Sequence, residues 1–182
     1  MKDSVIPMSS LFDEFKEIDT KKYIIRKICL NDSKDIFDIY GDIEVMKYDT
    51  RNRIESIDDT EDYIKLIHKG FDNKWFIKLG IVSKNSNELI GSIALHHFDY
   101  EKNRVEMGYN LKRVYWKQGI MSEVLKSVID YLAKYSSINE IEASIHSENI
   151  ASIKLAEKVG FKLIEKSNDD SLILRIRLKH FN

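Results

Sequence analysis

The sequence predicts an α+β fold, in which one mixed and mostly antiparallel sheet of about seven strands carries helices on both faces. Two segments of helical period follow the first strand-like segment, and three strand-like segments then come in direct succession. Helical and strand-like segments alternate in the rest of the chain. The resulting order, β-α-α-β-β-β-α-β-α-β-β, is typical of an α+β protein and not of a doubly wound parallel sheet.

The N-terminal half begins with a lead-in and a strand. Residues 22–28 (KYIIRKI) alternate well enough to form a half-buried strand. A helix is expected over residues 31–42, with Asn31 or Asp32 as its cap. A second helix is expected over residues 56–71, where apolar side chains recur at helical spacing.

Three strands are expected next, at residues 75–83, 88–98 and 104–111. The connections at 85–87 (NSN) and 101–103 (EKN) supply turn residues, so an antiparallel meander is predicted. Gly91 lies inside the second of these strands, where glycine often marks a bulge or a close backbone contact.

The C-terminal half contains two helices and three strands. Apolar positions recur every three or four residues from Gly119 to Tyr135, which predicts a helix. A further helix should end at Gly160, a residue type suited to a helix C-terminus. The remaining predictions are strands at 140–146, 161–167 and 171–178 and a helix at 149–160.

Composition excludes several classes of protein. The chain has 182 residues, of which 43% are hydrophobic and 32% charged, as in soluble globular proteins. Its net charge of −1 argues against a general nucleic-acid binder. The apolar runs are far shorter than the roughly 20 residues that span a bilayer. Because the N-terminus lacks a signal-peptide layout, we expect a cytoplasmic protein without a membrane partner.

One domain is expected over residues 18–182, preceded by an N-terminal extension at residues 1–17, because no linker-like segment divides the chain. Leu11, Phe12 and Phe15 recur at helical spacing in the extension, which predicts packing or a homodimer contact rather than chemistry. The single cysteine, Cys29, excludes an internal disulfide and is expected to be a small core residue.

The segment 114–125 (VYWKQGIMSEVL) is a candidate anion-binding turn. A strand ending at Leu111 leads through a short loop into a helix that begins near Gly119. First-turn amides lack intrahelical partners and carry partial positive charge, so the amides of residues 117–121 could converge on a phosphate. An ordinary strand-to-helix turn is the alternative, because the segment lacks the glycine patterns of nucleotide-binding loops.

Three polar residues accompany this turn. Glu106 lies among apolar neighbours in a strand and is either a general base or a solvent-facing strand glutamate. Asn149 is placed to cap the helix that follows it or to bind a ligand, and the two roles are compatible. Ser152 lies in the first turn of the same helix.

Five segments together resemble the GNAT superfamily of acetyl-CoA-dependent N-acyltransferases in order and spacing. They are IDTKKYIIRKI, ELIGSIAL, RVEMGYNL, YWKQGIMSEVL and NIASIKLAEKVGF. More narrowly, they resemble the branch that contains the ribosomal-protein N-terminal acetyltransferases (RimJ/RimL-like). The resemblance extends from Ile18 to Leu178, nearly the whole chain.

The resemblance implies a site for acetyl-CoA. Backbone groups near Leu111 and Arg113 would bind the pantetheine arm as an added strand would, and Asn149 would hold the pantetheine or the next strand. The turn departs from the superfamily pattern at both ends and carries a lysine where the branch usually has glycine. The pyrophosphate would lie on Trp116, Lys117, Gln118, Gly119, Ile120 and Met121.

The resemblance also implies roles in catalysis. Glu106 matches the strand glutamate of the branch and would remove a proton from the attacking amine. Many superfamily members have a tyrosine that protonates the departing thiolate, but Ala156 stands at that position here. Ser152 is the substitute that we expect to donate a hydrogen bond to the sulfur.

Two other groups of residues are weaker candidates. Strand alternation sends His96 and His97 to opposite faces, so at most one should approach a ligand, and we expect no metal site. Lys112, Arg113 and Lys117 form a basic cluster that either assists with phosphates or is a solvated surface patch.

The sequence thus predicts transfer of an acetyl group from acetyl-CoA to a primary amine, without a metal. The acceptor is expected to be a protein N-terminus or a small amine such as a polyamine. Asp42, Glu44 and Asp49 would attract a cationic amine or form a solvated face. The alternative function is a non-catalytic acyl-CoA-binding or sensor domain on the same fold.

Overall fold

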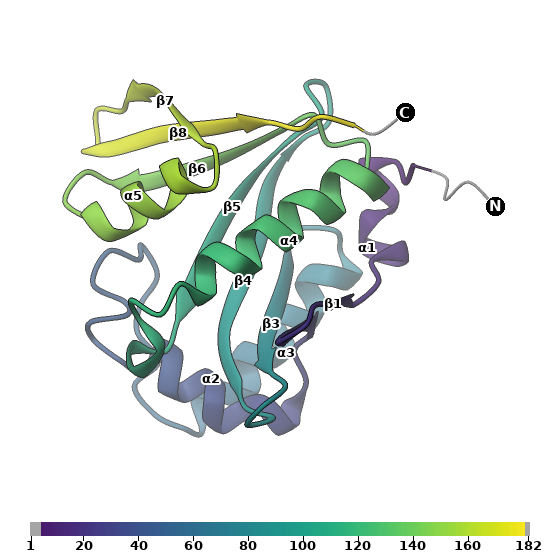
Figure 1. Ribbon diagram of the computed structural model, residues 1–182. Coiled ribbons are helices and arrows are strands. Elements are labelled where there is room, and N and C mark those ends of the chain that lie inside the picture. The colour runs from purple at the N-terminus through teal and green to yellow at the C-terminus, as the bar shows by residue number, and fades with distance from the viewer. Residues whose placement is uncertain (1–4, 181–182) are drawn as a thin grey trace. The chain divides into compact units, whose positions relative to one another are not determined.

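The computed structural model describes residues 5–180 and confirms the α+β prediction (Figure 1). Its eight-stranded sheet has the order β1-β2-β3-β4-β5-β6-β8-β7. The strands are β1 Ile18–Asp19, β2 Tyr23–Lys27, β3 Ile77–Ser83, β4 Leu89–Asp99, β5 Arg104–Leu111, β6 Glu140–His146, β7 Lys162–Lys166 and β8 Ser171–Arg177. The α-helices are α1 Leu11–Glu14, α2 Ser33–Tyr40, α3 Asp59–Asp72, α4 Ile120–Tyr135 and α5 Ile150–Lys158. The predicted strands are all present, and the short β1 is the additional one.

The described chain forms two compact units. The middle unit comprises residues 16–94 and 109–120. The terminal unit comprises residues 5–15, 95–108 and 121–180. Strands β4 and β5 each contribute residues to both units.

The core of the middle unit explains why its two helices form where the apolar spacing predicts them. Helix α2 buries Ile36 and Ile39, and helix α3 buries Ile64 and Ile67, in one cluster with side chains of β2, β3 and β4. Residues three and four apart share one face of a helix, so each helix presents an apolar stripe to this cluster. Burying one such side chain contributes about 1.5–3 kcal/mol to stability.

The start of α2 differs in detail from the expectation. Asp32 occupies the N-cap position, but its carboxylate does not bond to the first-turn amides of α2. It accepts hydrogen bonds from the Cys29 amide at 2.8 Å and from both terminal nitrogens of Arg26 at 2.8 Å. Cys29 itself is exposed, so the prediction of a core cysteine is wrong. Cys29 lies just after β2 and directly before the short 3-10 helix Leu30–Asp32 that precedes α2.

Gly91 in β4 marks a close backbone contact. A Cβ atom at this position would lie 2.6 Å from the carbonyl oxygen of Asn110 in β5, which is closer than real Cβ contacts allow. The residues of β4 and β5 in the middle unit therefore require glycine here.

The terminal unit includes the N-terminal extension. Leu11 and Phe12 of α1 are 0% and 2% exposed, and the Phe12 ring lies 4.9 Å from that of Phe98. The Phe15 ring lies 5.1 Å from that of Tyr131 in α4. The extension therefore packs into this unit. Residues 1–4 of the predicted extension lie outside the described residues.

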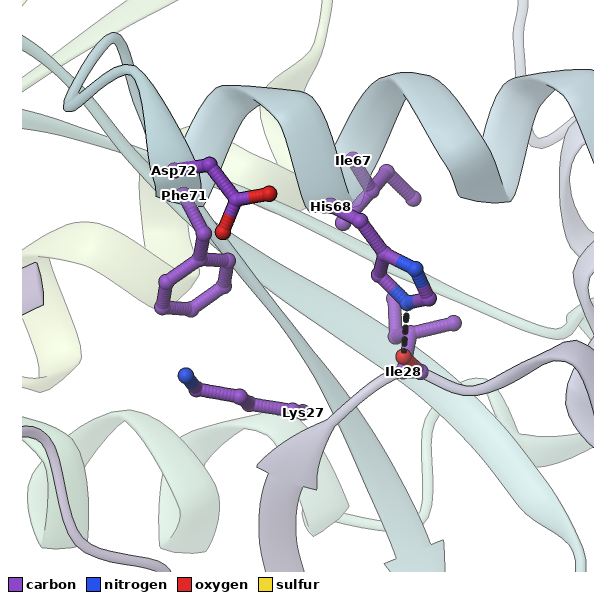
Figure 2. Close-up of a pocket in the computed structure, with 6 residues that line it drawn as sticks. All are labelled: Lys27, Ile28, Ile67, His68, Phe71 and Asp72. Carbon is purple, nitrogen blue, oxygen red and sulfur yellow. Dashed lines mark hydrogen bonds between the residues drawn. The ribbon is translucent and has the colours of Figure 1, made fainter.

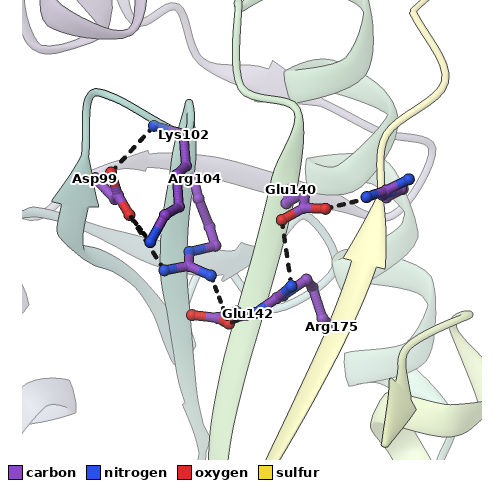
Figure 3. Close-up of polar contacts among 7 residues, drawn as sticks. Asp99, Lys102, Arg104, Glu140, Glu142 and Arg175 are labelled. Atoms are coloured by element: carbon purple, nitrogen blue, oxygen red, sulfur yellow. Dashed lines mark hydrogen bonds and ion pairs between the residues drawn. The ribbon is translucent and has the colours of Figure 1, made fainter. Parts of the chain in front are cut away.

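A ladder of charged side chains crosses four strands of the terminal unit (Figure 3). Arg104 of β5 contacts Asp99 of β4 and Glu142 of β6, both at 3.1 Å. Glu142 also contacts Arg175 of β8 at 2.5 Å, and Arg175 lies 3.5 Å from Glu140. These pairs lie on adjacent strands, so the alternating charges favour this strand order.

The pairing of β5 with β6 is parallel and short. It covers Arg104–Glu140, Val105–Ile141 and Glu106–Glu142. Strand β6 continues to His146, and it pairs with β8 along its whole length from Glu140 to His146. The parallel pairing therefore ends at Glu106 within the terminal unit.

Candidate functional site

The turn between β5 and α4 contains two left-handed residues. Lys117 has φ +60° and Gly119 has φ +76°. A Cβ atom at Gly119 would meet no described heavy atom within 4 Å, so the space beside this residue is open. Left-handed residues next to a helix N-terminus can turn successive amides toward one side, as in anion-binding nests. This conformation suits the glycine that the family resemblance implies at the position of Lys117.

Side chains of the turn hold its backbone. The Trp116 indole nitrogen donates a hydrogen bond to the Leu111 carbonyl at 2.8 Å. The side-chain amide nitrogen of Gln118 donates one to the Val114 carbonyl at 2.9 Å. Residues Arg113–Tyr115 form a short 3-10 helix, which the Trp116–Leu111 contact spans. The side chains of Trp116 and Gln118 thus stabilise the conformation of the loop itself.

The basic cluster near this turn is largely neutralised. The Lys112 ammonium is buried and contacts Asp35 at 2.6 Å and Asp38 at 3.0 Å. Burial lowers the pKa of Lys112, but the two carboxylates outweigh it and hold the pKa above its ordinary value. Arg113 lies 3.2 Å from Asp42. Of the three predicted basic residues, Lys112 and Arg113 therefore have acidic partners, and Lys117 is exposed.

Glu106 lies in the terminal unit with two histidines. Its Oε2 atom is 2.7 Å from Nδ1 of His97 and 3.8 Å from Nδ1 of His96. The Glu106 side chain is 23% exposed, which is compatible with access of a substrate amine or of water. The carboxylate is therefore oriented by a hydrogen bond rather than extended into solvent.

The prediction that the two histidines face opposite sides of the strand is wrong. His97 has φ +50°, a left-handed conformation that interrupts the alternation of an extended strand. The rings of His96 and His97 therefore meet edge to face with centroids 4.7 Å apart. Periodicity missed this arrangement because a single left-handed residue resets the face on which the next side chain lies.

Asn149 is the N-cap of α5. Its side-chain oxygen accepts a hydrogen bond from the Ser152 amide at 3.1 Å. Ser152 is half-buried in the first turn, and Ala156 is 1% exposed one turn later. The capping role of Asn149 is thus confirmed, and its predicted role toward pantetheine stays a prediction. Position 156 offers no proton donor.

A buried polar cluster in the middle unit escaped the sequence reasoning. Lys78 of β3 donates to the Tyr63 hydroxyl at 2.6 Å and lies over the Tyr40 ring, 4.5 Å from its centroid. The Tyr40 hydroxyl is 2.5 Å from that of Ser92. The Lys78 residue is 2% exposed, and this burial lowers the pKa of its ammonium. Lys78 sits in an apolar run of the sequence, and no local pattern signals its tyrosine partners.

Two hollows of the middle unit are lined by residues other than Lys117 and Gly119. One of about 270 Å³ is lined by residues of β2 and α3 (Figure 2). Within it, His68 contacts the Ile28 carbonyl at 2.8 Å and the Lys27 ammonium lies 4.5 Å from the centroid of the Phe71 ring. Another, of about 260 Å³, includes the paired residues Lys112 and Arg113.

The predicted site residues fall into two groups by unit. The middle unit holds Leu111, Arg113, Trp116, Lys117, Gln118, Gly119 and Ile120. The terminal unit holds Glu106, Met121, Asn149 and Ser152. Within the first group the structure brings Leu111 and Trp116 into contact, and within the second it brings Asn149 and Ser152 into contact.

Comparison with known proteins identifies the family. The family model described as an acetyltransferase (GNAT) domain matches residues 22–162. The chain is 30% identical to the uncharacterized N-acetyltransferase YoaA of Bacillus subtilis over 81% of this chain and 84% of that protein. It is 31% identical to the uncharacterized N-acetyltransferase p20 of Bacillus licheniformis over 79% of this chain and 80% of that protein.

Solved structures share the fold. An acetyltransferase of the GNAT family from Bacillus anthracis matches with a TM-score of 0.77 and 22% identity, over 89% of this chain and 98% of that one. RimL, a ribosomal L7/L12 alpha-N-protein acetyltransferase in complex with coenzyme A, has a TM-score of 0.75 and 16% identity, over 89% and 96%. The spermidine N-acetyltransferase of Vibrio cholerae, in complex with CoA and spermine, has a TM-score of 0.71 and 17% identity, over 87% and 97%.

The family model matches most of the chain. The structure adds a glutamate at the end of the short β5–β6 pairing and a left-handed turn before α4. The chain belongs to the GNAT family of acetyltransferases and is an acyltransferase.

Proposed function

We propose that this enzyme transfers the acetyl group of acetyl-CoA directly to a primary amine, with Glu106 as general base. The end of the β5–β6 pairing at Glu106 carries the proposal. The register of β5 with β6 ends at this residue, and pantetheine has amides that can bond to a strand edge as another strand does. A carboxylate at this point would lie beside the reacting end of such a ligand.

The reaction follows from these placements. The neutral amine attacks the thioester carbonyl carbon, the carbon–sulfur bond breaks, and CoA leaves as a thiolate. Glu106 takes the proton that the attacking nitrogen loses, directly or through a water molecule. The thiolate takes up a proton from Ser152 or from water, since Ala156 has none to give. Backbone amides beside the strand ends would stabilise the developing oxyanion.

The turn at residues 116–121 is proposed to bind the pyrophosphate of acetyl-CoA. The left-handed conformations of Lys117 and Gly119 and the open space at Gly119 support this role. Coenzyme A is present in the structures of RimL and of the spermidine N-acetyltransferase, which share the fold.

We propose a protein N-terminus or a small amine as the acceptor. RimL is named as an acetyltransferase of a ribosomal protein and another fold relative as an acetyltransferase of spermidine. A polyamine acceptor would need acidic groups that bind its cationic nitrogens. Asp42 and Asp49 already pair with Arg113 and Arg51, which favours an acceptor with fewer charges.

Two measurements test the function. Isothermal titration with acetyl-CoA should show binding below millimolar concentration, and its absence would remove the proposal. Release of CoA thiol should then be followed over peptides with varied N-termini, polyamines and aminoglycosides. Binding of acetyl-CoA without thiol release on any amine would instead favour a sensor domain.

The role of Glu106 is tested by Glu106→Gln, which keeps the shape of the side chain and removes its basicity. We expect turnover to fall by about 10²–10⁴-fold with acetyl-CoA affinity nearly unchanged. Arg104→Lys on the same strand, outside the proposed site, is the control. Equal turnover of Glu106→Gln and the parent protein across the pH range would exclude Glu106 from the mechanism.

A further inference from the structure

His96, His97 and Glu106 form a compact cluster of potential metal ligands in the terminal unit. Each of these side chains offers one ligand atom, and the three atoms lie within 4.8 Å of one another, close enough to hold one ion. Among the described residues, no other group of three or more His, Cys, Asp or Glu side chains does so. All three belong to adjacent strands β4 and β5. Their placement therefore rests on strand pairing and not on a mobile loop.

The distances between the ligand atoms fit tetrahedral coordination. The two His Nδ1 atoms are 3.2 Å apart, and Oε2 of Glu106 lies 2.7 Å from one and 3.8 Å from the other. Ligands at about 2.0–2.2 Å from a tetrahedral ion are about 3.3–3.6 Å from one another. The three observed separations scatter about that value, so small side-chain rotations would equalise them.

The backbone of His97 is what brings the ligands together. Its φ of +50° is uncommon for a residue other than glycine and costs about 1–2 kcal/mol. An extended residue at this position would send the His97 ring to the opposite face from His96. The left-handed conformation instead places both rings against one carboxylate.

We propose that His96, His97 and Glu106 bind a divalent transition-metal ion such as Zn²⁺. Two imidazole nitrogens and one carboxylate oxygen suit Zn²⁺, Co²⁺ or Ni²⁺ better than Mg²⁺ or Ca²⁺, which prefer oxygen ligands. Each His binds through Nδ1, so its ring proton resides on Nε2 in the bound state. His97 is 78% exposed as a side chain, so solvent has access to a fourth coordination position.

A bound ion would also occupy the carboxylate lone pair that accepts the substrate proton. The bound ion would therefore inhibit acetyl transfer reversibly. This consequence rests on the proposed function of Glu106. Metal binding itself is independent of that function, so it is measured directly. The two claims can then fail separately.

Isothermal titration of the full chain with ZnCl₂, after EDTA treatment and dialysis, tests the site. We expect one ion per chain and at least a tenfold loss of affinity in His97→Asn. Asparagine tolerates a left-handed backbone, so this variant removes the ligand and keeps the conformation. His180→Ala, remote from the cluster in sequence, is the matched control and should bind as the parent does.

Cobalt spectroscopy supplies a second measurement. Co²⁺ in a tetrahedral site of mixed nitrogen and oxygen ligands should give visible absorption bands that His96→Gln and His97→Asn both remove, while His180→Ala retains them. Unchanged titrations and spectra in these variants would overturn the proposal, because binding would then lie elsewhere. If the metal binds but does not inhibit acetyl transfer, the proposed metal site stands and the proposed role of Glu106 as general base is wrong.

Discussion

Lys117 shows how a single backbone angle explains a departure from the family pattern. The resemblance expects a glycine at this position, and the structure gives Lys117 a φ of +60°. A left-handed residue with a side chain costs about 1–2 kcal/mol, which glycine avoids. Because the lysine is exposed and the amides of the turn are the proposed phosphate ligands, its side chain is not required for the conformation.

We therefore predict that Lys117→Gly raises the free energy of unfolding by up to about 1 kcal/mol. The substitution relieves the backbone strain, but glycine also raises the entropy of the unfolded chain, which offsets part of the gain. Urea denaturation checks this. Gln118→Gly is the control, because Gln118 does not have a positive φ and its side chain bonds to the Val114 carbonyl. A gain as large in Gln118→Gly would contradict the conformational explanation.

Lys78 is buried against the phenols of Tyr40 and Tyr63, and this makes stability depend on pH. Burial lowers its pKa below the ordinary value of about 10.4. Between the folded and the unfolded pKa, the unfolded chain binds more protons, so the free energy of unfolding rises with pH. The cost of burying the ammonium is fully present below the folded pKa and is relieved as pH rises.

The prediction compares Lys78→Met, which removes the ammonium, with the parent protein. The stability of the parent relative to the variant should increase as pH rises from 7 toward the ordinary lysine pKa of about 10.4. Urea unfolding at several pH values measures it. Lys27→Met, at an exposed residue of β2, is the control. A constant difference for Lys78→Met would contradict the argument.

At the scale of elements, helix α5 begins with the hydrogen bond from the Ser152 amide to Asn149. Removing an N-cap costs about 0.5–2 kcal/mol. We predict that Asn149→Ala lowers the free energy of unfolding by about 1 kcal/mol and that Asn149→Asp, which retains the accepting oxygen, is nearly neutral.

The same pair of variants separates capping from ligand binding at Asn149. An aspartate keeps the cap but loses the side-chain amide that could donate to pantetheine. If the family role applies, Asn149→Asp should bind acetyl-CoA more weakly while unfolding at the parent's urea concentration. Unchanged acetyl-CoA affinity in both variants would limit Asn149 to capping.

The elements that periodicity predicts correctly are those whose burial is local. Helix α2 and strand β5 follow from the apolar spacing within their own residues, and Gly160, with φ +108°, ends α5 as expected. His97 could not be placed in this way, because a left-handed histidine has no sequence signature. The Lys78 cluster was also invisible, since its partners Tyr40 and Tyr63 come from other elements and only the fold brings them together.

At the scale of the whole molecule, the N-terminal extension behaves as part of the folded protein. The sequence separated residues 1–17 from the domain because the family resemblance starts at Ile18. The structure places a backbone bridge between Ile6 and Ser136, just after α4, and buries Leu11 and Phe12. Family resemblance cannot reveal such packing, because it covers only the segments that relatives share.

Phe12→Ala tests whether this packing stabilises the molecule. Phe12 is 2% exposed and contacts Phe98 near the end of β4, so the substitution leaves a cavity and should cost about 3–5 kcal/mol. Thermal and urea unfolding measure the loss, with Glu14→Ala, an exposed position of the same helix, as the control. A loss below about 1 kcal/mol would mean that the extension lies on the terminal unit without stabilising it. A large loss would show that an acetyltransferase domain cut at residue 18 lacks part of its own core.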